Sequence, residues 1–470
     1  MKTLKADLAV IGAGSGGLSV AAGAAQLGLK VVLFERGEMG GDCLNTGCVP
    51  SKALISAAKA AHDARHAGRL GVHAEPTVDF SAVMAHVHGV IETIAPIDSQ
   101  ERFEGLGVTV VRESARFVDA RTVAGDSVSV RARKIILAAG SRAAAPPIPG
   151  LSETPYLTNE TVFGLTVLPE HLIIIGGGPI GMELGQAFLR LGARVTVLEG
   201  GRALSKDDPD LAAVVIKAVR AEGLNLREGV KVEAAEKMPA GVAVTLDGGE
   251  RIEGSHLLIA AGRKPNLEGL NLEAAGIESN RHGVVTDRQL RTTNKRVYAV
   301  GDISGRAAFT HAAGAHASLV VRRTLFAAPI NVEKLTIPHA TYTQPELASV
   351  GMTEAEARAE HGDGVKVLTH SFHDNDRAQA EGDTVGFGKL ILDPKGRIIG
   401  AGIVGAHAGD LIEPLVLALD SGMKLSTIAS GVVAYPTRAE ITKRLAGQYF
   451  TPMLFSPRTR TLVSLLKRLA

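Results

Sequence analysis

Apolar runs and glycine-rich turns follow each other in an order that predicts two strand–turn–helix–strand units. Residues 8–35 read LAVIGAGSGGLSVAAGAAQLGLKVVLFE, and residues 172–199 read LIIIGGGPIGMELGQAFLRLGARVTVLE. Each segment opens with a short apolar run, turns through glycines into a stretch with helical spacing and ends in a second apolar run. Such continuous apolar runs are typical of parallel strands buried on both faces. The pattern therefore predicts two α/β units.

Both units carry a G-x-G-x-x-G turn and an acidic residue where the second strand ends. The residues are Gly12, Gly14, Gly17 and Glu35 in the first copy, and Gly176, Gly178, Gly181 and Glu199 in the second. In this turn the first glycine allows a tight bend, the second lets the backbone approach a pyrophosphate, and the third lets the helix pack on the strand. The pyrophosphate then lies at a helix N-terminus, and the acid accepts hydrogen bonds from a ribose. One such turn can arise from packing alone, whereas two complete copies predict two dinucleotide sites.

Glu199 bears on which dinucleotide the second site takes. A carboxylate repels a 2′-phosphate, and sites for NADP usually place an arginine nearby instead. Arg202 follows three residues later, but Gly200 and Gly201 provide no basic cluster. The second site is therefore predicted to prefer NAD(H) over NADP(H).

The composition excludes several classes of function. The 470 residues include 51 Lys and Arg against 49 Asp and Glu, a net charge of +2, and no Trp. Neither a basic surface nor an aromatic stacking platform for nucleic acid is expected. Residues 8–29 carry no charge and are long enough to suggest a membrane span, but their glycines bracket a strand-to-helix turn. We interpret this segment as buried and expect a cytoplasmic protein.

The chain has two cysteines, Cys43 and Cys48, within GGDCLNTGCVPSKAL. Two cysteines are too few for a disulfide-stapled scaffold or a Cys-only metal site, so no metal site is predicted. Pro50 suits a first helical turn, and a helix N-terminus together with Lys52 lowers a thiol pKa. Two buried free thiols are the alternative. The position at a helix start favours a redox-active pair.

The string G-G-x-C-x-N-x-G-C-x-P-S-K resembles the class I pyridine nucleotide–disulfide oxidoreductases, which include dihydrolipoamide dehydrogenase, glutathione reductase and mercuric reductase. The resemblance covers essentially the whole chain. Its other landmarks are AGRKPN (261–266), VYAVGDI (297–303), TYTQPELASVG (341–351), DRA (376–378) and YPTRAE (435–440). It implies an α/β fold with two Rossmann-like dinucleotide-binding domains and a C-terminal α+β dimerisation domain. The expected divisions are an FAD-binding domain (1–150 and 266–336), an NAD(H)-binding domain (151–265) and an interface domain (337–470).

The resemblance also implies cofactors and their contacts. FAD is expected at the first glycine-rich turn, with Asp302 at its ribityl–phosphate part and Ala115 touching it through the backbone. NAD(H) is expected at the second turn, with the loop at Gly262 closing over it.

The same resemblance implies roles for the residues around the cysteines. Cys48 would face the flavin as the charge-transfer thiolate, and Cys43 would be the outer thiol that exchanges with substrate. Lys52 would pair with Glu183 beside the flavin ring. A solvated lysine and an exposed glutamate on their respective helices are the alternatives for this last pair.

The chain departs from the family near its end. Disulfide-reducing members carry a His-Pro-Thr-x-x-Glu string whose His serves the partner subunit as acid and base, whereas this chain has Tyr435 and keeps Glu440. A phenol with a pKa of about 10 does not match an imidazole near 6.5 as a proton shuttle at neutral pH. Tyr435 is expected to donate a hydrogen bond, to position a ligand or to pack at the dimer interface. His311, His339 and His407 are candidates to replace the missing base, although a structural role is the favoured expectation for each.

These features predict a homodimeric FAD disulfide oxidoreductase acting on a dithiol or disulfide, either a small molecule or one carried on a protein. Dihydrolipoamide dehydrogenase-like activity leads because it agrees with the NAD(H) preference. Mercuric reductase-like activity is the alternative, since a thiophilic metal needs thiolates rather than a proton shuttle, although the additional cysteine pair of mercuric reductases is missing. A quinone or another acceptor is a further alternative.

The last residues suggest a different class, a flavoprotein that signals to a partner. No acid follows Glu440, and residues 454–469, LFSPRTRTLVSLLKRL, combine basic and apolar positions. They match a basic amphipathic helix for a membrane surface or a partner. A helix packed on its own subunit is the favoured alternative.

Overall fold

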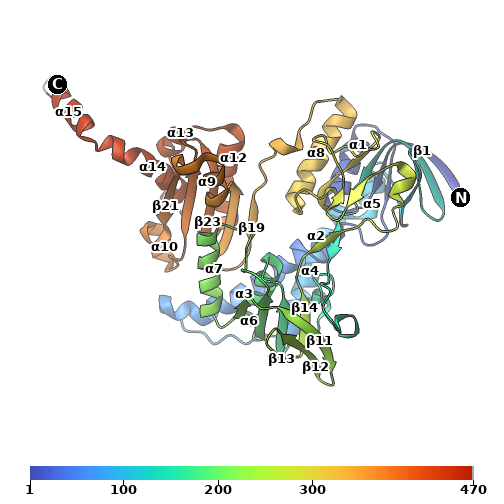
Figure 1. Cartoon of the computed structure of the whole chain (residues 1–470), viewed down its shortest axis with the longest axis horizontal. Coiled ribbons are helices and arrows are strands. Elements are labelled where there is room, and N and C mark those ends of the chain that lie inside the picture. The colour runs from blue at the N-terminus through green and yellow to red at the C-terminus, as the bar shows by residue number, and fades with distance from the viewer. Residues whose placement is uncertain (468–470) are drawn as a thin grey trace. The chain divides into compact units, whose positions relative to one another are not determined.

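The computed structural model describes residues 1–467, so the last two positions of the expected amphipathic helix at 454–469 lie outside the described part (Figure 1). The chain forms two compact units. Unit 1 comprises residues 1–65, 75–200 and 225–335, and unit 2 comprises residues 66–74, 201–224 and 336–470. The mixed α/β architecture with a separate C-terminal domain agrees with the predicted fold class. The expected divisions between cofactor domains stay a prediction.

The first sheet of unit 1 is built around the first predicted strand. Its order is β3-β2-β1-β6-β5-β4, and β18 pairs with β6 in parallel. The strands are β1 (Lys2–Ile11), β2 (Val31–Phe34), β3 (Thr109–Val111), β4 (Arg116–Asp119), β5 (Thr122–Ala124), β6 (Val128–Leu137) and β18 (Val297–Ala299). Helix α1 (Ser15–Gln26) joins β1 to β2 and packs against α8 (Thr310–Phe326). Residues 8–29 are thus the end of a buried strand, a turn and a helix, as predicted.

The second sheet of unit 1 has the order β10-β9-β8-β14 with all neighbours parallel. Its strands are β8 (His171–Ile175), β9 (Arg194–Glu199), β10 (Asn225–Glu228) and β14 (His256–Ile259), and α6 (Pro179–Leu191) joins β8 to β9. The predicted second unit therefore repeats the strand–helix–strand order of the first. The smaller strands of unit 1 are β7 (Ser141–Ala143), β11 (Val232–Met238), β12 (Gly241–Leu246), β13 (Arg251–Gly254), β15 (Arg263–Pro265), β16 (Ser279–Asn280) and β17 (Gly283–Val284).

Four helices follow β2 in the chain: α2 (Gly41–Asn45), α3 (Cys48–His66), α4 (Phe80–Asp98) and α5 (Gln100–Gly105). The helical stretch Phe80–Gly105 is long and apolar enough to cross a membrane, judged by length and composition, and 17% of its most apolar window is buried. This stretch is not a long uncharged run in the sequence, because Glu92 interrupts it.

Unit 2 contains a five-stranded antiparallel sheet of order β19-β20-β23-β22-β21. Its strands are β19 (His339–Thr341), β20 (Glu346–Gly351), β21 (Lys366–Ser371), β22 (Phe387–Leu392) and β23 (Ile398–Gly405). The helices of this unit are α7 (Pro209–Ala221), α9 (Glu354–His361), α10 (Asp376–Glu381), α11 (Ala408–Leu411), α12 (Glu413–Ser421), α13 (Leu425–Ser430), α14 (Glu440–Leu454) and α15 (Pro457–Leu466). The expected α+β character of this region is confirmed.

Helix α7 lies in unit 2 although its sequence falls between β9 and β10 of unit 1. Lys389 of β22, 3% exposed at its side chain, forms ion pairs with Asp208 at 3.0 Å, Asp210 at 2.8 Å and Glu354 at 2.7 Å. Because a buried ammonium is stable only when paired, these carboxylates hold the N-terminus of α7 against the sheet of unit 2.

Candidate active site

The first glycine-rich turn combines two tightly packed glycines with one open position. Gly12 has φ +103°, and a Cβ there would lie 2.4 Å from the carbonyl oxygen of Ala138. A Cβ on Gly17 would lie 1.8 Å from the Gly12 carbonyl oxygen. At Gly14 the nearest atom would be 4.0 Å away, and this residue caps the N-terminus of α1. The turn is closed by packing except above the first turn of the helix, where a pyrophosphate fits.

The second turn has the same geometry. A Cβ on Gly176 would lie 2.5 Å from the Ala260 carbonyl oxygen, and one on Gly181 would lie 1.9 Å from that of Gly176. Around Gly178, the N-cap of α6, no described atom lies within 4 Å of the same position. Neither helix has a side-chain cap among the described residues. Both turns therefore present backbone N–H groups to an anion in the same way.

The two acids at the strand ends reach back to their turns. Glu35 accepts a hydrogen bond from the Ala13 N–H at 2.6 Å, and Glu199 accepts one from the Gly177 N–H at 2.7 Å. Each carboxylate thus lies beside its glycine-rich turn, where the ribose of a dinucleotide would meet it. These observations fit one dinucleotide at each turn.

The cysteines are carried on a loop that packs directly on the first turn. The Gly40 N–H donates to the Ala13 carbonyl oxygen at 3.0 Å. A Cβ on Gly41, which has φ +63°, would lie 2.7 Å from the Gly14 Cα. This backbone-to-backbone approach explains the paired glycines before Cys43. It also places the cysteine-bearing helix α2 beside the predicted FAD turn.

The two thiols are free and differ sharply in acidity. The hydrogen bond from Cys43 is the largest cause lowering the Cys48 pKa to about 6, and Thr310 and Lys52 lower it further against the opposing effect of burial. The Cys43 pKa is raised by the same hydrogen bond and by burial. At neutral pH this geometry makes Cys48 the thiolate and Cys43 the thiol. That agrees with the charge-transfer and exchange roles implied by the resemblance, which remain predictions.

Thr310 also lowers the pKa of Cys48, a role that the sequence motifs did not indicate. Its Oγ1 lies 3.4 Å from the Cys48 Sγ and belongs to the first turn of α8. Cys48 itself is the first residue of α3. The N-terminal ends of two helices therefore meet at this sulfur, and their dipoles favour its charged form.

Lys52 lies one turn into α3, and its Nζ is 2.8 Å from the Glu183 Oε2 on α6. The Glu183 side chain is 7% exposed and the Lys52 side chain 37% exposed. The contact joins the cysteine helix to the helix of the second dinucleotide turn. The two residues expected at the flavin ring are thus adjacent, and their role there stays a prediction.

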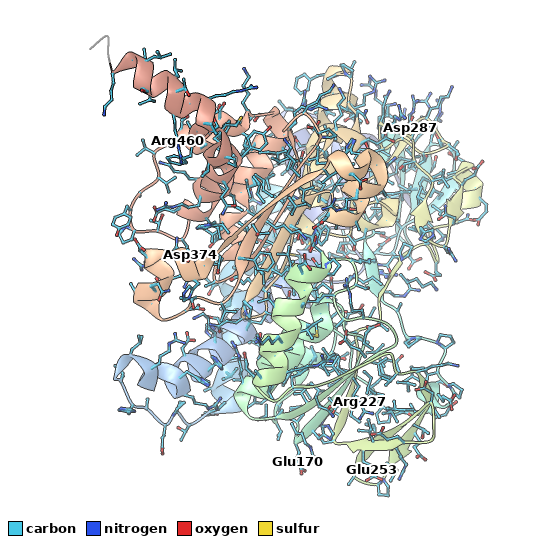
Figure 2. The ribbon with its side chains drawn as sticks, turned by 60° about the vertical axis from the view of Figure 1, so that its left-hand side comes forward. Glu170, Arg227, Glu253, Asp287, Asp374 and Arg460 are labelled. Carbon is cyan, nitrogen blue, oxygen red and sulfur yellow. The ribbon has the colours of Figure 1, made fainter. Side chains whose placement is uncertain are left out.

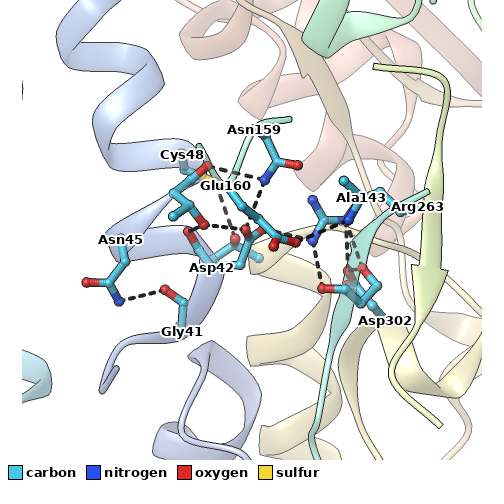
Figure 3. Close-up of polar contacts among 12 residues, drawn as sticks. Gly41, Asp42, Asn45, Cys48, Ala143, Asn159, Glu160, Arg263 and Asp302 are labelled. Atoms are coloured by element: carbon cyan, nitrogen blue, oxygen red, sulfur yellow. Dashed lines mark hydrogen bonds and ion pairs between the residues drawn. The ribbon is translucent and has the colours of Figure 1, made fainter. Parts of the chain in front are cut away.

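Arg263 connects three segments that carry expected site residues (Figure 3). Its guanidinium lies 2.9 Å from the Asp42 carboxylate and 3.7 Å from that of Asp302, and it donates to the Ser141 hydroxyl at 2.8 Å. Ser141 also contacts Asp302. Arg263 belongs to the AGRKPN landmark, and Asp42 directly precedes Cys43. Their sequence context marked them as part of a motif without indicating that they pair.

A buried histidine, His316, accepts a hydrogen bond from the backbone next to Asp302. The Gly301 N–H donates to the His316 Nδ1 at 3.3 Å, and His316 is 1% exposed. Burial lowers the pKa of His316 to about 4, so the ring stays neutral and keeps its acceptor at neutral pH.

The two remaining residues that were predicted to contact the cofactors, Ala115 and Gly262, also belong to unit 1. Ala115 is buried, and the Cβ position of Gly262 has no described neighbour within 4 Å.

Tyr435 and Glu440 belong to unit 2. The Tyr435 side chain is 70% exposed and donates from its hydroxyl to the Asp376 carboxylate at 3.1 Å. This hydrogen bond raises the pKa of Tyr435 above its ordinary value. Glu440 begins α14 and lies 3.8 Å from Arg444.

The three histidines considered as substitutes for the missing base have other contacts. His311 stacks on Phe309 with ring centroids 5.2 Å apart. His339 hydrogen-bonds Asp207 at 2.8 Å. His407 lies 4.0 Å from Asp410 and has φ +61°. These contacts agree with the favoured expectation of a structural role for each, which stays a prediction.

Two dinucleotide turns joined to a paired thiol and thiolate define a nucleotide-dependent dithiol–disulfide redox enzyme. Residues 6–317 match the family model described as pyridine nucleotide-disulphide oxidoreductase, and residues 337–446 match the dimerisation domain of that family. The chain belongs to this family. It is an FAD-dependent NAD(P)H disulfide oxidoreductase, and its dimerisation domain supports a homodimer.

Individual relatives differ in their substrates. Mercuric reductase of Streptomyces lividans is 37% identical, with 95% of this chain and 96% of the relative covered. Dihydrolipoyl dehydrogenase of Geobacillus stearothermophilus is also 37% identical, with 94% and 96% covered. Among solved structures, the HOCl-induced flavoprotein disulfide reductase RclA of Escherichia coli is 28% identical and has a TM-score of 0.85, with 94% of this chain and 99% of that chain covered. A Cu(II) complex of RclA has a TM-score of 0.84.

Proposed function

We propose that this enzyme passes electrons from NADH through FAD and the Cys43–Cys48 pair to a thiophilic metal ion. The observation that carries the proposal is Tyr435, which stands where a disulfide reductase has its base. Its proton is directed at Asp376 and its pKa is raised, so it does not accept a proton at neutral pH. A substrate whose turnover depends on such a base is therefore disfavoured.

A thiophilic metal ion does not need that base. Binding to the metal deprotonates a coordinating thiol outright, so the proton of Cys43 leaves without help from a side chain. Cys48 is already a thiolate near neutral pH because its pKa is about 6. The names of the relatives that act on mercury or bind Cu(II) support this substrate class.

The electrons balance in two half-reactions. One NADH and the disulfide give NAD⁺, the Cys43 thiol and the Cys48 thiolate; FAD, when bound, carries the two electrons between them. The thiol, the thiolate and two Cu(II) ions then give the disulfide, two Cu(I) ions and one proton. In this cycle Lys52 stabilises the Cys48 thiolate, and Glu183 holds Lys52 in place.

The choice of NADH rests on Glu199, whose carboxylate lies at the second turn and would repel a 2′-phosphate. Arg202, the arginine that follows Glu199 most closely, donates to the Asp207 carbonyl oxygen, so its guanidinium is already engaged with the protein backbone. We also infer that the enzyme is cytoplasmic.

Dihydrolipoamide dehydrogenase activity is the second candidate. The relative of that name is matched over 96% of its length, and the preference for NAD(H) suits it. In this case the substrate would be a dithiol or disulfide, and another group would serve as the base.

Anaerobic mixing distinguishes the two candidates. Oxidised holoenzyme is mixed with NADH and, separately, with dihydrolipoamide, and the long-wavelength thiolate–flavin absorbance is followed. We expect NADH to raise this absorbance and dihydrolipoamide to leave it unchanged. Two equivalents of Cu(II) per enzyme should then remove it from the NADH-reduced protein.

Two variants serve as controls. Cys43→Ser should abolish the response to Cu(II) while NADH still reduces the flavin, and Tyr435→Phe should leave the response to Cu(II) unchanged. If dihydrolipoamide raises the absorbance as fast as NADH does, the lipoamide assignment replaces the metal one. A loss of the Cu(II) response in Tyr435→Phe would show that the phenol takes part.

A further inference from the structure

The C-terminal segment 451–467 projects from unit 2 without a core of its own (Figure 1). The last buried residue of α14 is Ala446, and α15 has no buried residue among its described positions. The favoured expectation of a helix packed on its own subunit is therefore not what the structure has. The dimerisation-domain model also ends at residue 446, so the segment extends beyond the matched domain.

Large apolar side chains are exposed along this segment. They are Met453, Leu454, Phe455, Leu462, Val463, Leu465 and Leu466, each between 52% and 68% exposed. Leu462, Leu465 and Leu466 stand three and four positions apart, so they share one face of α15. A contiguous exposed apolar surface of this kind is uncommon on a soluble protein and marks a site of interaction.

The charges of the segment have one sign. Arg458, Arg460 and Lys467 are exposed, and no acidic residue follows Glu440. Figure 2 labels Arg460 on this segment. Among the described residues, no acidic side chain lies within ion-pair distance of these three cations. Arg460 and Lys467 are seven positions apart and therefore lie on one face, away from Leu462 and Leu466. Arg458 stands four positions before Leu462 and lies on the leucine face one turn earlier, so Arg460 and Lys467 form the cationic side of the helix.

We propose that residues 453–467 dock the enzyme on an anionic membrane surface. In this arrangement the leucine face of α15 enters the boundary between head groups and acyl chains, and the cations contact lipid phosphates. Anionic lipid is the occupant that meets both features, because a second copy of the same helix would bring like charges together. The apolar face and the basic charge supply the two signals that stable membrane attachment requires.

Vesicle co-sedimentation of the full-length holoenzyme tests this proposal. The probes are vesicles of phosphatidylcholine mixed with phosphatidylglycerol, and vesicles of phosphatidylcholine alone. We expect binding to the anionic vesicles that weakens as salt is raised, and little binding to the neutral ones. Deletion of residues 452–470 should abolish binding without changing the FAD content or the reduction of the flavin by NADH.

Point variants separate the two contributions. Neutralising one cation should lower the partition coefficient about fivefold, so R458Q/R460Q/K467Q together should lower it about a hundredfold. L462S and L466S should each lower it more than about tenfold. The matched controls are K424Q, an exposed lysine of unit 2, and V167S, an exposed valine of unit 1; both should bind like the parent enzyme.

Three results would overturn the proposal: no binding to anionic vesicles at low salt, equal binding to neutral vesicles, or binding that the tail variants leave unchanged. Sedimentation velocity of the parent and the deleted enzyme adds a fourth. A change in oligomeric state on deletion would assign the segment to contacts between protein chains instead. The acceptor assay is independent of all four results, so a failure here leaves the proposed function standing.

Discussion

The acidity of Cys48 can be tested by removing a single hydroxyl group. The Thr310 Oγ1 lies 3.4 Å from the Cys48 Sγ, and its hydrogen bond lowers the pKa of that thiol to about 6 together with the contributions of Cys43 and Lys52. Thr310→Val removes the hydrogen bond while keeping the branched shape of the side chain. Thr310→Ser keeps the hydroxyl and should behave like the parent.

The size of the effect follows from the geometry. A hydrogen bond to a charged group is worth about 1.5–3 kcal/mol, and we take a lower value, about 1.4 kcal/mol, because the contact is long at 3.4 Å. That energy equals about one pKa unit. The pKa should therefore rise from about 6 to about 7, and the thiolate fraction at pH 7 should fall from about 90% to about 50%.

The assay is the pH dependence of Cys48 alkylation by iodoacetamide in the reduced enzyme, read by mass spectrometry of the peptide. It reports the thiolate directly and does not depend on turnover. The long-wavelength absorbance of the reduced holoenzyme, followed over the same pH range, provides a second midpoint. If Thr310→Val titrates within about 0.3 units of the parent, the hydroxyl does not stabilise the thiolate and the argument from this contact fails.

Other contacts give predictions of the same kind. Gly178→Ala should fold normally, because its Cβ would meet no protein atom, and it should raise the KM for NADH, because the methyl group would stand where the pyrophosphate is expected. Gly181→Ala should fail to fold, since its Cβ would lie 1.9 Å from a carbonyl oxygen. Thermal melts test the folding of both variants, and NADH titration tests binding. His316 has a pKa of about 4, below its ordinary 6.5, so the unfolded chain binds more protons between these values and stability falls as pH drops through that range. In urea unfolding, His316→Gln should lose about 2 kcal/mol less stability than the parent between pH 7.5 and pH 5; an equal loss in both would contradict this. Lys389→Met should cost about 3–5 kcal/mol by leaving the buried carboxylate of Asp208 without its ammonium partner. Lys424→Met, at an exposed lysine, should cost less than about 0.5 kcal/mol in the same unfolding measurement.

The spacing of residues in the sequence was sufficient to predict those parts of the structure that are formed by residues close together in the chain. Both strand–turn–helix units form where the glycines and apolar runs predict them, and Glu35 and Glu199 stand beside their turns. The start of α3 at Cys48 also follows from local signals, because a helix N-terminus is defined by a few consecutive residues. These features depend on backbone geometry over a short stretch, which composition and period describe well.

Contacts between distant segments were decided by the tertiary structure. Thr310 meets Cys48 across a separation of 262 residues, and Arg263 meets Asp42 across 221. Such segments are brought together by pairing between strands that are far apart in the sequence, such as β6 and β18, and a local pattern does not specify which strands pair. The exposure of α15 belongs here too. Its amphipathic pattern favoured a helix packed on its own subunit, whereas in the structure the last buried residue is Ala446 of α14 and α15 has no buried residue among its described positions. Sequence therefore determined which chemistry the chain carries, and packing determined which side chains tune it.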